Sequence, residues 1–376
     1  MSAHVTAKGA ASVAFMLLVA GLMPLLAGCG QLRSIDERAM VTGVAIDRGE
    51  EPGTVQVMLQ WYHGGEPAQA STGGGGGGGA SVLLANRSAK GTGIADAVAA
   101  IQARTDRQFN FGVTEIILVS EDLAREGVAP YLDYLWRKPE FSQLAQIIVV
   151  RGKASEMLEA GGPSGTAFRL YQYMSTARAA AAGSVPIPFW RFLALSYAKV
   201  QDPWAPLLTL DKGHFASVGT AVFQGDRMTG ALGRSQTAGL SWILHVAGYQ
   251  DITTAAPGSG APLSLHVQST SVQQSVDQQG IAHLRLVLST QVQEGYRVNL
   301  SMEDLRGLES VAAQTALSDV QSTIRDLQAA GSDVVGFGER LRERSPRATE
   351  NWIASFARLP VAVEVTVHIR AGGRAA

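Results

Sequence analysis

Apolar residues follow a two-residue period near the start of the chain. Residues 39–47 form a run rich in valine, alanine and isoleucine, typical of a strand. After residues 48–53, apolar side chains recur at every second position, at Val55, Val57, Leu59 and Trp61. This spacing indicates a strand with one buried face. The Gly- and Pro-containing segment between the two runs therefore predicts an antiparallel hairpin.

Helix and strand patterns then alternate up to residue 150. Ile94, Val98 and Ile101 lie on one helical face, and Thr92 is placed to cap that helix. Buried strands are predicted at 113–119 and 147–150, with a helical segment around 131–135 between them. This β-α-β-α-β order indicates a mixed α/β N-terminal region, long enough for two subdomains.

Residues 161–210 show a different pattern. An alanine-rich helix is predicted over 170–182, followed by prolines at positions 186, 188, 203 and 206. Proline lacks a backbone donor and fixes φ, which disfavours regular sheet. We therefore expect a Pro/Trp connector at about 183–210, in extended or turn geometry.

The remaining residues predict an α+β domain. Strands are expected at 216–223 and 228–232, joined by a turn at 224–227, and at 284–292. Apolar residues spaced near 3.6 predict a long helix over 303–327, which Gly331 ends. Strict alternation over 359–370 predicts a final strand. The expected fold is α+β or mixed α/β, with an N-terminal domain over 29–210 and a C-terminal domain over 211–376, whose long helix packs on a largely antiparallel sheet.

The first 29 residues resemble a lipoprotein export signal. His4 and Lys8 precede an apolar stretch over 10–25, and Leu26-Ala27-Gly28-Cys29 follows. Small residues before a cysteine are what lipoprotein processing requires, and Cys29 is the only cysteine in the chain. The alternative is a buried cysteine after an ordinary cleavage site. We expect residues 1–28 to be a signal peptide and Cys29 to carry the lipid, which places a membrane-anchored chain on the extracytoplasmic side.

Charge and low-complexity content exclude some partners. The formal net charge is −1, which argues against nucleic acid, because phosphate binding needs a concentrated basic face. Residues 73–79 are all glycine, inside a Gly-rich stretch over 66–80. A phosphate-binding loop would end in Gly-Lys-Ser/Thr, which is missing here, so a surface loop is expected.

The sequence offers no catalytic, cofactor-binding or metal-binding set. No two of the seven histidines have the i, i+4 spacing of ligands on one helix face, and no Gly-x-Ser-x-Gly motif is present. Three carboxylate pairs could be imagined as a catalytic acid and base, namely Asp36/Glu37, Glu121/Asp122 and Glu303/Asp304. Two of these three pairs stand where a helix would begin, so stabilisation by the helix dipole explains them. Of the six tryptophans, Trp190 and Trp204 are flanked by prolines and are the candidates for an exposed partner contact.

Several segments together resemble one family, the C subunits of spore nutrient-germinant receptors, or Ger(x)C lipoproteins. The similar segments follow in order along the chain: 35–47, 117–127, 132–137, 221–230, 333–338 and the pair Trp352 and Phe356. Two positions depart from the family pattern. Gly30 stands where members commonly have tryptophan, and Gly112 where they often have histidine.

This resemblance implies a non-enzymatic lipoprotein of the inner spore membrane that assembles with membrane-embedded A and B subunits and uses no cofactor. Nutrient molecules trigger germination through such receptors, and whether this subunit binds a small molecule itself stays open. Two other functions remain as alternatives. One is a solute-binding lipoprotein of a transporter, which needs a pocket between two lobes. The other is a cell-wall hydrolase.

Overall fold

The computed structural model describes residues 38–63, 83–161, 165–175, 183–245, 251–255, 262–292 and 302–370. Cys29, the expected signal peptide 1–28 and the Gly-rich stretch 66–80 lie outside the described residues.

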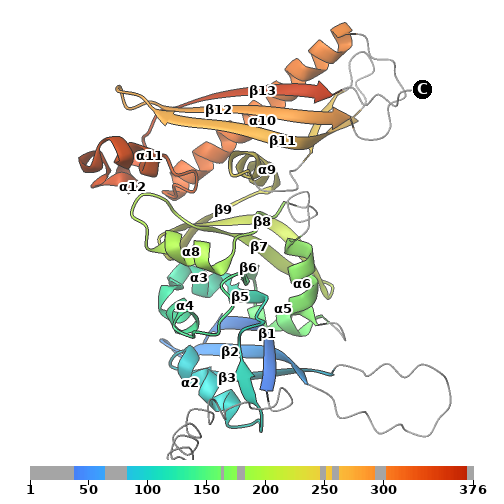
Figure 1. The fold of residues 1–376 in the computed structure, drawn as a ribbon, viewed down its shortest axis with the longest axis vertical. Helices are drawn as coiled ribbons and strands as arrows, with labels where there is room; N and C mark the ends of the chain where they lie inside the picture. Colours follow the sequence, from blue (N-terminus) through green and yellow to red (C-terminus); the bar gives the residue numbers. More distant parts are fainter. Residues whose placement is uncertain are drawn as a thin grey trace, which may run out of the picture. The chain divides into compact units, whose positions relative to one another are not determined.

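A mixed sheet organises the described part of the N-terminal half (Figure 1). Its strand order is β3-β2-β1-β5-β6-β7-β8-β9, and β4 pairs with β1. β1 pairs in parallel with β5, β5 with β6 and β6 with β7, whereas the outer pairs are antiparallel. The strands span Arg38–Arg48 (β1), Val55–His63 (β2), Leu83–Gly91 (β3), Gln108–Asn110 (β4), Ile116–Ser120 (β5), Gln146–Arg151 (β6), Trp204–Asp211 (β7), His214–Gln224 (β8) and Arg227–Leu232 (β9).

Helices cover both faces of this sheet, which explains why β5 and β6 are apolar throughout. Ile116 and Leu118 pack with helices α5 and α6, whereas Ile117 and Val119 pack on the opposite face with α2, α3, α4 and α8. The helices span Ile94–Gln102 (α2), Glu121–Glu126 (α3), Ala129–Trp136 (α4), Ala154–Glu159 (α5), Thr166–Met174 (α6) and Phe189–Ser196 (α8).

Two buried polar side chains attach α5 and α6 to the sheet. The Asp47 carboxylate accepts hydrogen bonds from the backbone N–H groups of Ala154 (2.6 Å) and Ser155 (2.9 Å), at the start of α5. Gln60 donates to the Leu158 carbonyl at 3.1 Å and accepts from the Ala167 N–H at 3.0 Å. The first-turn donors of both helices thus find acceptors on strands β1 and β2.

The C-terminal half adds a second sheet with the order β10-β11-β12-β13. The β12–β13 pair is parallel and the other two pairs are antiparallel. Helix α10 packs against β13, β10 and α9, and it buries Leu308, Ala312, Ala316, Val320 and Leu327 on one face. These elements span Arg234–Ile243 (α9), Ile252–Ala255 (β10), Pro262–Val276 (β11), Ala282–Val292 (β12), Met302–Ala330 (α10) and Val361–Arg370 (β13). Between α10 and β13 lie Phe337–Arg344 (α11), a 3₁₀ turn at Pro346–Thr349 and Trp352–Phe356 (α12).

The expected mixed α/β and α+β architecture is confirmed, including the first hairpin, the long helix and the final strand. Two local predictions were wrong. Helix α2 has Gly93, not Thr92, at its N-cap, and Thr92 instead donates its N–H to the Asp96 carboxylate at 3.0 Å. The helix expected over 170–182 begins earlier, as α6, and residues 176–182 lie outside the described part of the chain.

The extended or turn geometry predicted for the Pro/Trp connector holds over 183–188 and 197–203, but it was wrong for the parts that form helix α8 and strand β7. Pro188 is the N-cap of α8, where a φ of −74° suits a proline and no backbone donor is needed. Pro206 lies within β7, an internal strand between β6 and β8. The parallel pairing with β6 covers only Leu207–Thr209, and Pro206 lies just before it. The missing N–H of Pro206 therefore removes no hydrogen bond from this pairing.

Candidate functional site

Helix α4 is held in place by the turn between β8 and β9. The Asp226 carboxylate accepts a hydrogen bond of 3.1 Å from the N–H of Ala129, the first residue of α4. The Asp226 carbonyl accepts a second one, of 3.0 Å, from the N–H of Val128. A carboxylate at a helix N-terminus accepts a hydrogen bond from an N–H group that has no partner within the helix, and its negative charge interacts favourably with the helix dipole. The turn therefore fixes the helix that carries Asp133 and Trp136.

Helix α8 is fixed at its first turn. The N–H of Phe189 donates to the carbonyl of Ala145 at 2.8 Å, and the N–H of Trp190 donates to that of Gln143 at 3.2 Å. Phe189 is fully buried, so the next side chain, Trp190, points outward. The two helices contact each other.

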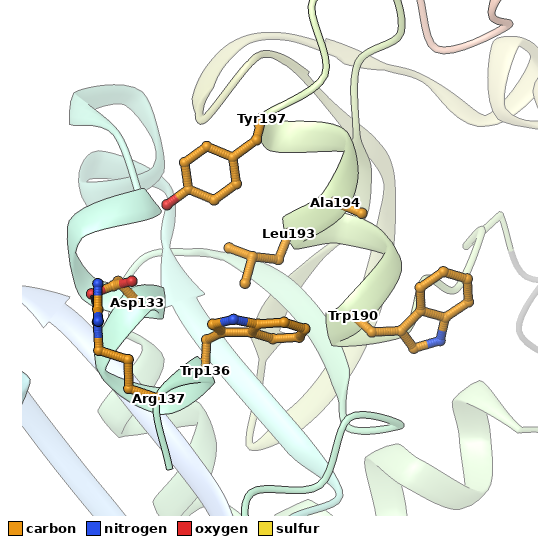
Figure 2. Close-up of a pocket in the computed structure, with 7 residues that line it drawn as sticks. All are labelled: Asp133, Trp136, Arg137, Trp190, Leu193, Ala194 and Tyr197. Atoms are coloured by element: carbon orange, nitrogen blue, oxygen red, sulfur yellow. Dashed lines mark hydrogen bonds and ion pairs between the residues drawn. The ribbon is translucent and has the colours of Figure 1, made fainter. Parts of the chain in front are cut away.

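A groove of about 430 Å³ lies between α4 and α8 (Figure 2). Leu193 forms a buried part of its lining, whereas Trp136 is 48% exposed, Trp190 47% and Tyr197 64%. In Figure 2 the Trp136 indole lies below Leu193, and the Tyr197 ring extends from the end of α8 toward Asp133. The lining residues are Asp133, Trp136, Arg137, Trp190, Leu193, Ala194 and Tyr197. We call this the α4–α8 groove.

One ion pair provides the charged part of the lining. The Arg137 Nε lies 2.6 Å from an Asp133 carboxylate oxygen, one helical turn away. The hydrogen bond to Asp133 and the attraction of its charge raise the pKa of Arg137 above its ordinary value. The two groups satisfy each other, so the rest of the groove offers mainly apolar surface.

A row of aromatic rings connects this groove with the first hairpin. Ring centroids are 6.3 Å apart between Trp136 and Phe189 and 5.3 Å apart between Phe189 and Phe141. The row continues through Phe111, Phe109 and Trp61 at steps of 6.1, 6.4 and 5.2 Å. The first two contacts and the last are edge-to-face and the other two are tilted; such ring contacts stabilise the core and restrict the Trp136 ring.

The structure separates the two tryptophans that the sequence singled out. Trp190 is exposed and lines the groove, and its role as a partner contact stays a prediction. Trp204 is 1% exposed, and its indole N–H donates to the Val185 carbonyl at 3.1 Å. The prediction that Trp204 is exposed was therefore wrong, because it begins an internal strand and fills the core. Cys29, the expected lipidation site, lies outside the described residues.

Sequence reasoning missed Trp136 and Tyr197 as groove residues. Each stands at the end of a short helix, at the last residue of α4 and the C-cap of α8. An aromatic residue at that position has no continuing turn to cover it. The position at the end of a helix could have indicated that these two side chains are exposed, whereas the apolar spacing within the helices does not.

A second hollow, of about 880 Å³, lies beside the β8–β9 turn and α12. Its lining is more polar and includes Lys199, Asp202, Arg342, Glu350 and Asn351. Asp202 accepts hydrogen bonds from the N–H groups of Gly225 and Asp333, at 2.9 and 2.8 Å. Burial raises the pKa of Asp202, and these two backbone donors oppose that rise.

Two of the carboxylate pairs lie in the first turn of a helix. Glu121 and Asp122 occupy the first turn of α3, and Glu303 and Asp304 that of α10, as predicted. Glu121 also pairs with Arg125 at 2.6 Å and Arg151 at 3.2 Å.

The described residues contain no group of three or more His, Cys, Asp or Glu side chains placed to hold a metal ion. Within the same residues, no helix is both long and apolar enough to cross a bilayer.

Known proteins match both halves of the chain. The family model "Spore germination protein N-terminal domain" matches residues 31–210, and "Spore germination B3/GerAC like, C-terminal" matches residues 218–373. YfkR of Bacillus subtilis (strain 168), named as a spore germination protein, is 27% identical over 374 residues, covering 93% of this chain and 94% of its own. The crystal structure of the GerBC protein has a similar fold, with a TM-score of 0.55 and 18% identity, over 88% of this chain and 97% of that one.

Proposed function

Because the chain belongs to the Ger(x)C family of spore germination proteins, we propose that it is the lipoprotein C subunit of a nutrient-germinant receptor. In this role it acts with membrane-embedded A and B subunits to trigger germination. The function is that of a binding and assembly component, without catalysis of its own.

One observation carries this proposal. The two family models match consecutive regions, 31–210 and 218–373, in the expected order. Together they leave only the first 30 residues, a short junction and the last three residues unmatched. The similarity to YfkR extends over the same length, so the likeness concerns the whole chain and not a single shared module.

Cys29 supplies the membrane attachment in this proposal. A single acyl chain gives weak, reversible membrane binding, and two or more chains are needed for stable attachment. Complete lipoprotein modification of Cys29 meets that requirement. The attachment places the folded residues at the outer face of the inner spore membrane, beside the A and B subunits.

Deletion of the gene in its own host tests the function. We expect sporulation to proceed normally and germination with one class of nutrient to be lost, while germination by a non-nutrient trigger remains. Restoring the gene should restore the nutrient response. Normal nutrient germination in a deletion strain that has no paralogue would contradict the proposal.

A pair of variants tests the anchor. Cys29→Ala removes the acylated thiol, so we expect the chain to leave the membrane fraction and receptor assembly to weaken. Gly30→Ala changes the neighbouring residue and keeps the thiol, so it should behave like wild type. Unchanged membrane retention of Cys29→Ala, measured after a carbonate wash, would show that partner contacts alone hold the chain.

The polar hollow of about 880 Å³ favours a second candidate function, a solute-binding lipoprotein of a transporter. Pockets of this size accept small molecules, and the exposed side chains of Lys199 and Glu350 offer both charges. Calorimetric titration with amino acids and sugars separates the two functions. Micromolar binding by the isolated chain, lost in a Glu350→Gln variant that still folds, would favour the solute-binding function.

A further inference from the structure

We propose that one edge of the first sheet, where strands β1, β5 and β6 begin, lies against the lipid surface and inserts Val113, Leu144 and Trp190 at the headgroup boundary. We call these three side chains the amino edge. The inference deepens the proposed function and rests on its lipid anchor at Cys29. It names the face of the folded chain that meets the bilayer.

Backbone hydrogen bonds bring the three side chains together. Strands β1, β5 and β6 are parallel, so all three begin at the same edge of the sheet. Two backbone bonds of 3.3 and 2.8 Å join the segment before β5, 111–115, to the segment before β6, 142–146. Val113 and Leu144 stand at the middle of these two segments. The N–H of Trp190 donates to a carbonyl of the second segment at 3.2 Å, which places Trp190 next to Leu144.

The amino edge is apolar and open to solvent. Leu144 is 67% exposed, Trp190 47% and Val113 41%, and they are three of the nine most exposed large apolar side chains in the described part of the chain. Glu115 is the only ionisable residue of the two segments, and one of its carboxylate oxygens is buried. Burial also raises the pKa of Glu115. An apolar surface that contains tryptophan and little charge suits the boundary between headgroups and acyl chains.

The lipid-bearing end of the chain enters the sheet beside this edge. The Thr114 hydroxyl, next to Val113, donates to the Val41 carbonyl of β1 at 3.1 Å. Twelve positions separate Cys29 from Val41, and a fully extended chain of that length spans at most about 43 Å. An anchor at Cys29 therefore keeps the amino edge within this distance of the bilayer.

The short connection makes a weak contact sufficient. Three apolar side chains alone would hold a free protein on a bilayer only weakly. A surface that is tethered by a short linker meets its target at an effective concentration of about millimolar. The anchor fixes the distance to lipid and to no particular protein, which is why we assign the amino edge to the bilayer.

A fluorescent reporter on the amino edge tests the contact. Leu144→Cys introduces the only free thiol of the mature chain, because Cys29 is the one native cysteine and carries the lipid in the proposed function. The thiol takes an environment-sensitive fluorophore. The acylated full-length chain is then reconstituted alone into phosphatidylcholine–phosphatidylglycerol vesicles that contain a spin-labelled quencher lipid. Val311→Cys, on α10 and 44% exposed, carries the same fluorophore as the control.

The two labelled chains should differ. We expect the fluorophore at position 144 to be quenched about fivefold more than the one at position 311, because groups at the headgroup boundary lie close to the quencher. Adding Val113→Ser should lower the quenching at position 144 by about half. Adding Val311→Ser instead, the same change at a similarly exposed valine, should leave it unchanged. The quenching should persist in about 0.5 M salt, because salt screens charges and not apolar insertion.

Several results would overturn the inference. Equal quenching at the two positions, in variants that circular dichroism melting shows to be folded, would exclude the amino edge as the bilayer contact. Loss of the quenching in high salt would assign the contact to charged groups. Shielding of position 144 only in spore membranes that hold the A and B subunits would identify a protein partner instead.

These results are separate from the test of the proposed function. Equal quenching at the two positions leaves that function in place when the deletion strain still loses its nutrient response. Quenching confined to position 144 supports the amino edge even in a host whose deletion strain germinates normally. An acylated chain that does not stay on the vesicles at all would exclude both the anchor and this inference.

Discussion

The indole Nε1 of Trp352 donates a hydrogen bond of 2.9 Å to the carboxylate of Asp333, which lies 19 positions earlier in the chain. The same carboxylate accepts the backbone N–H groups of Gly336, Phe337 and Gly338 at 2.8, 3.2 and 2.8 Å. Asp333 is 1% exposed. One buried side chain thus shapes the turn between α10 and α11 and fixes the start of α12.

Replacing Asp333 with asparagine should destabilise the protein. The amide has nearly the same shape, but its NH₂ group would face donors that now bond to a carboxylate oxygen. We expect the free energy of unfolding at neutral pH to fall by about 3 kcal/mol, measured by urea denaturation. Asp211→Asn, at an exposed carboxylate at the end of β7, is the control and should change little. An unchanged midpoint for Asp333→Asn would mean that the bonds from these donors contribute nothing to stability.

Stability should also depend on pH through Asp333. Burial raises its pKa from 3.8 to about 6, even though the four N–H donors act in the opposite direction. The folded protein then holds a proton that the unfolded chain releases between pH 4 and 6. The contribution of this residue to the free energy of unfolding should therefore fall by about 3 kcal/mol as the pH rises through that window.

The pH effect is measured as the difference in unfolding free energy between wild type and Asp333→Asn at pH 4.5, 5.5 and 6.5. The variant cannot titrate at this position, so the difference isolates Asp333. A wild-type advantage that grows with pH would show that the N–H donors outweigh burial and hold the carboxylate ionised.

Two glycine-to-alanine changes should have opposite effects. A Cβ at Gly338 would lie 2.5 Å from the Val200 carbonyl oxygen and would also collide with the Trp352 indole, so we expect a loss of about 2 kcal/mol or more. A Cβ at Gly307, exposed on α10, meets nothing within 4 Å. Alanine there should stabilise the helix by about 0.5–1 kcal/mol. Thermal unfolding of the two variants checks both signs, and equal shifts would contradict the steric argument.

Removing the Asp47 carboxylate should loosen α5 selectively. Asp47→Ala leaves the N–H groups of Ala154 and Ser155 buried without their acceptor, so we expect a loss of about 2–3 kcal/mol. Hydrogen exchange should rise most in the first turn of α5. Glu51→Ala, in the exposed turn of the first hairpin, is the control. Unchanged protection of α5 would show that packing alone holds the helix.

Elements with strong periodicity were predictable from sequence. The apolar stripe of α10 and the alternating apolar residues of β13 each indicate which face of the element packs against the core. Strands β3 and β11 were missed, because β3 is an edge strand with little buried surface and much of β11 is serine and glutamine. These two strands form because they pair with a neighbouring strand, and the pattern of apolar residues within each segment does not indicate that pairing.

The groove was predictable only in part. Trp190 lies two residues after Pro188, in the first turn of α8, and is 47% exposed. Trp204 follows a proline too, yet it enters an internal strand, and only the pairing of β7 with β6 and β8 distinguishes the two cases. Asp333 lies in a segment that resembles the family. Three of its donors belong to the turn that follows it, but the fourth, the Trp352 indole, comes from α12, and this contact is not visible in the sequence.

The pairing of β7 with β8 limits how this protein can vary in evolution. β7 ends the region matched by the first family model, and β8 enters the region matched by the second at residue 218. Trp204–Asp211 and His214–Val222 are nevertheless hydrogen-bonded neighbours in one sheet. A chimera that joins halves of two paralogues near residue 213 must keep this register and the core side chains that depend on it. The two halves therefore diverge under a shared constraint. A foreign C-terminal half should be tolerated only when its first strand still fits the edge of β7.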